Sequence, residues 1–161
     1  MLFVHEASAA VLLVAVTLVL QCAGMAALIQ WARVHLRRGS RRFGPVRATV
    51  LMIRLTSLIV CLHTLQILLW AWFYRWKCFA TWESAFYFSA ASYSTVGYGD
   101  VVLPLRWRTV GPLESVIGVL MFGLSASFLF AVVTRLVEHD WRAELAKASA
   151  DSGSTVAVTK K

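Results

Sequence analysis

Residues 94–100, which read Ser-Thr-Val-Gly-Tyr-Gly-Asp, lie in an apolar chain and have the composition of an ion site. Backbone carbonyls of consecutive residues, joined by a threonine hydroxyl, can replace the water around a dehydrated cation such as potassium. Consecutive carbonyls face one axis only where the backbone alternates between conformations, some with positive φ. Gly97 and Gly99 reach positive φ without a Cβ penalty. The expected oxygen ligands are the carbonyls of Thr95, Val96, Gly97 and Tyr98, with the Thr95 hydroxyl.

Neighbouring residues are expected to support these ligands. The side chains of Val96 and Tyr98 should point away from the ions. Residues at helical spacing on the preceding stretch should pack behind Tyr98. The support residues expected from this pattern are Tyr87, Phe88, Ala91, Gly99 and Asp100.

Residues 95–100 resemble the selectivity filter of potassium channels, and the resemblance extends from about residue 81 to residue 137. Six matching residues between two apolar helical stretches are more specific than a pair of glycines, since a motif counts only in its structural context. The alternative is a glycine-rich turn between two membrane helices. The resemblance implies passive conduction of K⁺, with K⁺ as the bound and permeating ion and no other cofactor.

The same resemblance implies a tetrameric pore. The family builds its pore from four such segments, and this chain contains one. The expected partners are therefore three further copies of the chain.

The composition is that of a membrane protein. Hydrophobic residues make up 59% of the 161 positions, compared with about 45–50% in soluble domains. Three apolar stretches have about the 20 residues that a helix needs to cross a bilayer, at 7–31, 55–74 and 113–137. The predicted fold is all-α, with three transmembrane helices and a re-entrant pore helix and filter loop between the second and third.

We divide the chain into four parts: an extra N-terminal transmembrane helix (1–32), a basic connection (33–49), a pore domain (50–137) and a short cytoplasmic tail (138–161). The first apolar run has no basic residues before it, so we expect a retained helix rather than a signal peptide. The two-helix channels that the chain resembles have no such helix, so its role stays open.

The net charge of +8 follows membrane topology rather than nucleic-acid binding. Arginines crowd the first connection, and such clusters mark the cytoplasmic side. This predicts a multi-pass protein of the cell (inner) membrane, with an extracytoplasmic N-terminus and a cytoplasmic C-terminus. Basic residues around the pore region oppose this bias. Anionic headgroups of the inner leaflet are expected partners of Arg37, Arg38, Arg41 and Arg42.

Residues 81–94 predict a helix too short to span a membrane. Thr81 is the expected N-cap, and Glu83 in the first turn complements the positive end of the helix dipole. The C-terminal end should then point toward residues 95–100. In the resembling channels, four such ends favour a cation in a central cavity.

The chain departs from several bacterial two-helix channels at Ala91, where those channels have a glutamate that pairs with the aspartate after the filter. Asp100 lacks that partner here. Tyr87 is the only nearby hydroxyl that could reach Asp100. We therefore expect a single phenol-to-carboxylate hydrogen bond at the outer end of the segment.

Small residues recur along the last helix, and Gly118 and Gly123 are candidate gating hinges. Close packing is the alternative explanation for such residues in membranes. After residue 138 the chain becomes polar. Residues 142–150 could continue the helix, and residues 151–161 are expected to be disordered.

Two polar residues, His63 and Gln66, fall near the middle of the second transmembrane stretch. An ionisable residue inside a membrane is a functional candidate by default. A neutral histidine bonded to Thr17 or Gln21 of the first helix is the structural alternative, which we favour. Cys78, in the outer loop, is either a free thiol, which we favour, or an intersubunit bridge.

Three other functions compete with potassium conduction. A weakly selective cation channel would share the fold, but the tyrosine position is commonly changed in such relatives and Tyr98 is present. A potassium transporter of the pore-loop type needs about four repeats in one chain. A non-conducting or modulatory subunit of a heteromeric channel leaves no sequence signature. An enzyme is not expected, because no nucleophile, base or metal-ligand cluster has usable spacing.

Overall fold

The computed structural model describes residues 2–38 and 45–158, and the side chains of residues 8–34, 46–138, 141 and 142. The elements are α1 (Leu2–Arg38), α2 (Pro45–Lys77), α3 (Trp82–Tyr93), the 3₁₀ helix η1 (Leu105–Trp107) and α4 (Val110–Val158). The described residues contain no β-strand. The predicted all-α class is confirmed.

Three apolar segments are long enough to cross a membrane, at Ser8–Val34, Val46–Lys77 and Leu105–Glu138. Each overlaps one predicted span and is longer than it. Many large apolar side chains on these segments are exposed, as expected of surfaces that face lipid. The chain is a multi-pass membrane protein with three transmembrane helices.

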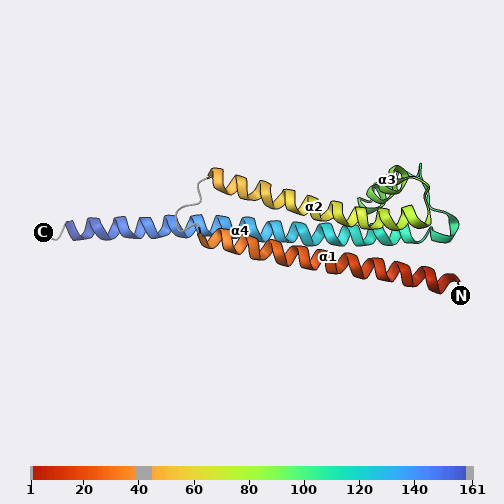
Figure 1. The fold of residues 1–161 in the computed structure, drawn as a ribbon. Helices are drawn as coiled ribbons and strands as arrows, with labels where there is room; N and C mark the ends of the chain where they lie inside the picture. Colours follow the sequence, from red (N-terminus) through yellow and green to blue (C-terminus); the bar gives the residue numbers. More distant parts are fainter. Residues whose placement is uncertain (1, 39–44, 159–161) are drawn as a thin grey trace.

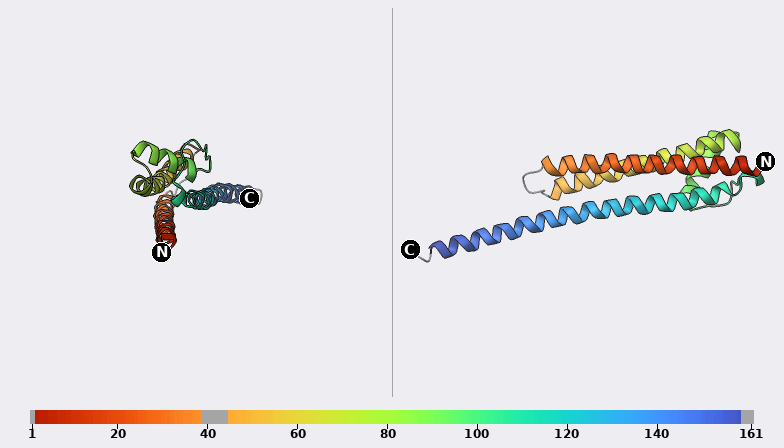
Figure 2. Two further views of the ribbon diagram at one scale, coloured as in Figure 1. Left: turned by 90° about the vertical axis from the view of Figure 1, so that its right-hand side faces the viewer. Right: turned by 90° about the horizontal axis from the view of Figure 1, so that it is seen from below.

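The three long helices run side by side, and α3 packs beside one end of the bundle (Figure 1). The chain reverses direction between α1 and α2 and again between α2 and α4. As a result, the N-terminus lies at the same end as α3, and the C-terminus lies at the far end beyond α1 and α2. Seen along the bundle, α1, α2 and α4 form a triangle (Figure 2).

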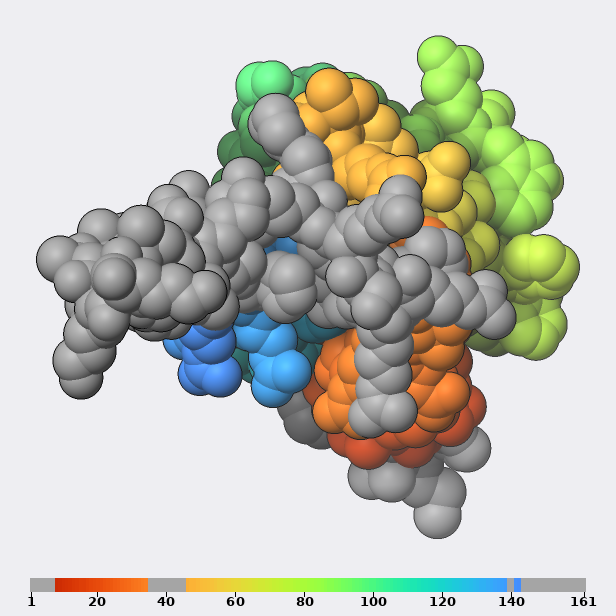
Figure 3. Space-filling model, turned by 90° about the vertical axis from the view of Figure 1, so that its left-hand side faces the viewer, coloured from red at the N-terminus to blue at the C-terminus, as the bar shows by residue number. Residues whose placement is uncertain are grey.

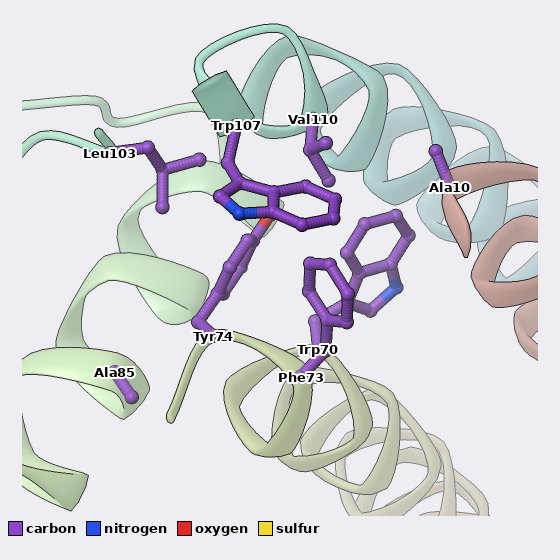
Figure 4. Packing of buried hydrophobic residues seen from close by; sticks show 8 residues of the cluster. All are labelled: Ala10, Trp70, Phe73, Tyr74, Ala85, Leu103, Trp107 and Val110. Atoms are coloured by element: carbon purple, nitrogen blue, oxygen red, sulfur yellow. The ribbon is translucent and has the colours of Figure 1, made fainter. Parts of the chain in front are cut away.

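A core rich in aromatic residues holds α3 against the bundle. Trp70, Phe73 and Tyr74 of α2 point toward Trp107 of η1 and Val110 at the start of α4 (Figure 4). The rings of Phe73 and Trp107 meet edge to face, with centroids 5.1 Å apart. Aromatic pairs in this geometry add to the energy of simple burial. The loop that follows residue 100 is thereby fixed to α2.

The ends of α3 follow its sequence signals. Thr81 is the N-cap, and its hydroxyl accepts a hydrogen bond from the Ser84 backbone N–H at 3.3 Å. At the other end, the Ser94 N–H bonds to the Ala90 carbonyl at 3.1 Å. The predicted short helix and its cap are confirmed.

Two regions differ from expectation. The basic connection is shorter than predicted, because α1 continues to Arg38 and α2 begins at Pro45; residues 39–44 lie outside the described residues. Residues 142–150 do continue α4. The expected disorder of residues 151–158 is wrong, since α4 extends to Val158. A helix that is already formed gains one hydrogen bond for each residue added, so a polar segment can extend it without a core.

Candidate functional site

The backbone of residues 95–100 alternates in conformation. Thr95, Gly97 and Gly99 have φ values of 62°, 50° and 78°. Positive φ thus falls on every second residue, as a row of carbonyls facing one side requires. The sequence predicted this for the two glycines and missed Thr95.

Thr95 is the one non-glycine residue with positive φ in the described chain. For a β-branched residue this conformation is a genuine outlier. Such strain costs on the order of 1–3 kcal/mol and persists only where the surroundings enforce it. Here the Thr95 N–H bonds to the Ser92 carbonyl at 3.0 Å, and the Gly97 N–H bonds to the Ala91 carbonyl at 3.1 Å. The last turn of α3 therefore sets the geometry of the segment after it.

At the other end of the segment, Asp100 accepts two hydrogen bonds. The Tyr87 hydroxyl donates to Oδ2 at 2.8 Å, which confirms the expected phenol-to-carboxylate bond. The Val101 backbone N–H also donates, to Oδ1 at 3.0 Å. The expectation of a single bond is therefore wrong, because a backbone donor in the loop cannot be identified from residue types. The bond to Asp100 raises the pKa of Tyr87 above its ordinary value.

The back of the segment is open in a single chain. A cavity of about 550 Å³ lies among Tyr87, Phe88, Ala91, Tyr98 and the start of α4. Tyr98 is 72% exposed and Val96 is 51% exposed. The expected support residues of α3 therefore line a cavity next to Tyr98 and do not enclose its ring.

The two candidate hinge glycines lie in different surroundings. A Cβ atom on Gly118 would fall 2.1 Å from the Tyr93 backbone oxygen, so this glycine lets α4 approach the end of α3 closely. A Cβ atom on Gly123 would meet nothing within 4 Å. Ser115, one turn before Gly118, donates a hydrogen bond to the Ser92 carbonyl at 2.7 Å.

A buried carboxylate behind α3 was missed by the sequence reasoning. Glu114 of α4 is fully buried and accepts hydrogen bonds from Tyr74 of α2 at 2.8 Å and from Ser89 of α3 at 2.6 Å. The Ser89 hydroxyl also lies 2.9 Å from the Ile67 carbonyl. The sequence feature that could have identified this site is a glutamate within an apolar helix, because a carboxylate is costly to bury there unless it is hydrogen-bonded.

The second missed feature is the set of partners of His63. Its Nδ1 lies 2.9 Å from the Tyr93 hydroxyl and its Nε2 lies 3.1 Å from the Ser125 hydroxyl. The predicted bond to Thr17 or Gln21 is therefore wrong. Those two residues of α1 bond instead to Trp70 at 3.0 Å and to Gln66 at 2.7 Å. The helical rotation that decides between such partners is set by packing, which residue types alone do not specify.

Carboxylate, thiol and imidazole groups form no cluster of three that could hold a metal ion among the residues the structure describes. The oxygens of residues 95–98 are their backbone carbonyls and the hydroxyls of Thr95 and Tyr98.

Residues 58–135 match a family model described as an ion channel. The match covers most of α2, all of α3, residues 95–100 and α4 as far as Arg135, and it leaves α1 outside. No curated protein and no solved structure matches the chain. The match supports an ion channel rather than an enzyme, and channels of this type usually form oligomers in membranes.

Proposed function

We propose that the protein is a potassium-selective channel that conducts K⁺ passively. The observation that carries this proposal is the positive φ at every second residue of a Thr-Val-Gly-Tyr-Gly segment that lies between two membrane spans. Carbonyl oxygens arranged in this way replace the hydration shell of K⁺. Residues 95–100 are therefore called the filter.

Four copies of the chain form the proposed pore. One chain supplies one filter, and its Tyr98 and Val96 side chains are largely exposed beside an open cavity. A neighbouring copy that covers these side chains would support the filter from behind. The surfaces left exposed in one chain therefore favour assembly around a common axis.

The filter and the N-terminus are proposed to lie on the extracytoplasmic side, and the C-terminus in the cytoplasm. The fold puts the first two at one end and the third at the other (Figure 1). The arginine-rich connection lies between α1 and α2 at the end away from the filter, where basic residues favour the cytoplasm.

Anionic lipids are proposed partners at that end. The side chains of Arg37, Arg38, Arg41 and Arg42 lie outside the described residues. Arg33 of α1 and Arg135 of α4 do line a cavity of about 200 Å³, whose other lining is mainly apolar. Figure 3 shows this end of the molecule, with atoms of α4 (blue) close to those of α1 (orange). Two arginines in the lining of an otherwise apolar cavity suit a phosphate headgroup and its acyl chain.

Ion flux into liposomes tests the proposed function. In liposomes loaded with potassium, we expect the outward potassium gradient to drive rubidium uptake through the protein. Potassium added outside should suppress this uptake far more than sodium does. Gly99→Ala is the control, because alanine at φ 78° is strained and should disturb the filter. Equal suppression by sodium and potassium would indicate a weakly selective channel, and no uptake would indicate a modulatory subunit.

A further inference from the structure

Five buried side chains form a closed ring of hydrogen bonds between the helices, here called the polar ring. Gln21 of α1 bonds to Ser125 of α4 at 3.1 Å, and Ser125 bonds to His63 of α2 at 3.1 Å. His63 bonds to Tyr93 of α3 at 2.9 Å, and the Tyr93 hydroxyl bonds to Gln66 of α2. Gln66 bonds back to Gln21 at 2.7 Å. The ring thus joins all four helices.

The direction of donation around the polar ring is fixed. The Gln21 amide nitrogen also lies 3.4 Å from the Met121 carbonyl, which can only accept, and this sets the orientation of the Gln21 amide. Gln21 therefore donates to Ser125, and its carbonyl oxygen accepts from the Gln66 amide, whose own carbonyl oxygen accepts the single proton of the Tyr93 hydroxyl. Nδ1 of His63 must then donate to the Tyr93 oxygen, so Nε2 of the neutral ring accepts from the Ser125 hydroxyl.

All five bonds therefore run in the same direction around the polar ring. Each bond pairs one donor with one acceptor. None of the five side chains is more than 6% exposed. Because an unsatisfied polar group in hydrocarbon costs several kcal/mol, opening one link weakens the arrangement of the others.

The polar ring reaches the filter through Tyr93. Tyr93 is the last residue of α3, two positions before Thr95. Its side chain is held by His63 and Gln66, and its backbone oxygen lies against Gly118 of α4. The position of Tyr93 therefore determines where the strained backbone of the filter begins.

We propose that α1 is a filter-positioning element and that Gln21 is its positioning residue, acting through Gln66 on Tyr93. This inference rests on the proposed function. It assigns a role to the helix that lies outside the matched family region. Loss of the Gln21 amide should raise the sodium permeability of the pore relative to potassium severalfold, although Gln21 touches neither the filter nor an ion.

The chain offers a matched control one turn away. Thr17 of α1 accepts a hydrogen bond from Trp70 at 3.0 Å, is fully buried and stands outside the polar ring. Thr17→Val keeps the shape of the side chain and removes a buried bond between the same two helices. An effect that arises only from weaker helix packing should appear in Thr17→Val as well as in Gln21→Met.

The first test compares relative sodium and potassium permeability in wild type, Gln21→Met, Ser125→Ala and Thr17→Val, each checked for intact oligomers. Ser125→Ala removes the α4 hydroxyl that bonds to Gln21 and His63, so it breaks the polar ring without changing any residue of α1. We expect sodium permeability to rise in Gln21→Met and Ser125→Ala and to stay at the wild-type value in Thr17→Val. A selective wild type in which Gln21→Met and Thr17→Val behave alike overturns the inference and leaves the proposed function intact. A non-selective wild type overturns the proposed function and the selectivity role together.

The second test does not depend on conduction. Nitrogen NMR of ¹⁵N-histidine-labelled protein, with the signal assigned by a His63→Gln variant, should show a neutral His63 ring with its proton on Nδ1. Gln21→Met should shift this signal through Ser125, which bonds to both Gln21 and His63, whereas Thr17→Val should leave the signal unchanged. A proton on Nε2, or a signal unaffected by Gln21→Met, contradicts the polar ring.

Discussion

At the outer end of the filter, the Asp100 carboxylate is shared between a phenol and a backbone amide. Tyr87 donates from α3 and the Val101 N–H donates from the loop. Each bond fixes one carboxylate oxygen, so removal of one leaves the side chain attached but free to rotate. Two independent hydrogen bonds therefore restrain the outer end of the filter, and loss of one leaves the other in place.

Tyr87→Phe removes the phenol oxygen and with it one of the two hydrogen bonds to the Asp100 carboxylate. We expect a looser outer filter and weaker discrimination of potassium over sodium, with conduction retained because the Val101 bond persists. Reversal potentials of the variant and wild type measure this. Thr64→Val is the control, since its hydroxyl bonds only to the Val60 carbonyl of its own helix at 2.9 Å. Identical selectivity in Tyr87→Phe and Thr64→Val would contradict the role of the phenol.

The pH dependence of this bond is set by the direction of the Tyr87 shift. The bond to Asp100 raises the pKa of Tyr87, so the protonated donor is favoured in the folded protein. Its contribution is fully present below the ordinary pKa of about 10 and is lost only as the pH rises through the higher folded value. Ionisation of Tyr87 should therefore not alter the outer filter between about pH 7 and 9.

Cys78 should react slowly with alkylating reagents. Burial raises the pKa of its thiol to about 11. At pH 8 only about one thiol in a thousand is then the reactive thiolate, compared with roughly one in four at the ordinary pKa near 8.5. Iodoacetamide labelling and mass spectrometry should show the rate increasing with pH up to about 11. Fast labelling at pH 8 would mean that the outer loop opens.

Residue types alone predicted the part of the site that depends on local sequence. The two glycines with positive φ, the Thr81 cap and the Tyr87 to Asp100 bond are fixed within one turn or one short segment. The contacts of Glu114 and His63 were not predicted. They join helices far apart in sequence, and their partners depend on the rotation of each helix.

At the scale of elements, α3 is held by close contact with α4 as well as by its core. Gly118 permits this contact, because any side chain there would collide with the Tyr93 oxygen. Hydropathy was sufficient to predict the three spans. It did not predict that α4 continues through a polar tail to Val158.

Alanine substitutions should distinguish the two glycines of α4. Gly118→Ala must displace α3 or α4, at a cost of about 1–3 kcal/mol, and should lower the melting temperature of the purified protein. Gly123→Ala has open space and should leave stability unchanged or slightly higher. If Gly123 is the hinge, its variant should change open probability alone. Equal destabilisation by both substitutions would contradict the close contact at Gly118.

At the scale of the whole molecule, the proposed pore requires four chains. Chemical cross-linking in mild detergent should produce bands that stop at four. We expect the same limit for Gln21→Met, because the polar ring lies within one chain. A dominant dimer or trimer would contradict a pore with one filter per chain.

The reversal potential with potassium on one side of a planar bilayer and an equal concentration of sodium on the other tests the central claim most directly. Carbonyl oxygens at the spacing of a K⁺ filter accept sodium poorly, so the current through wild-type protein should reverse far from zero, at a potential that is positive on the sodium side. A reversal potential close to zero would show that the alternating backbone of residues 95–100 does not select potassium.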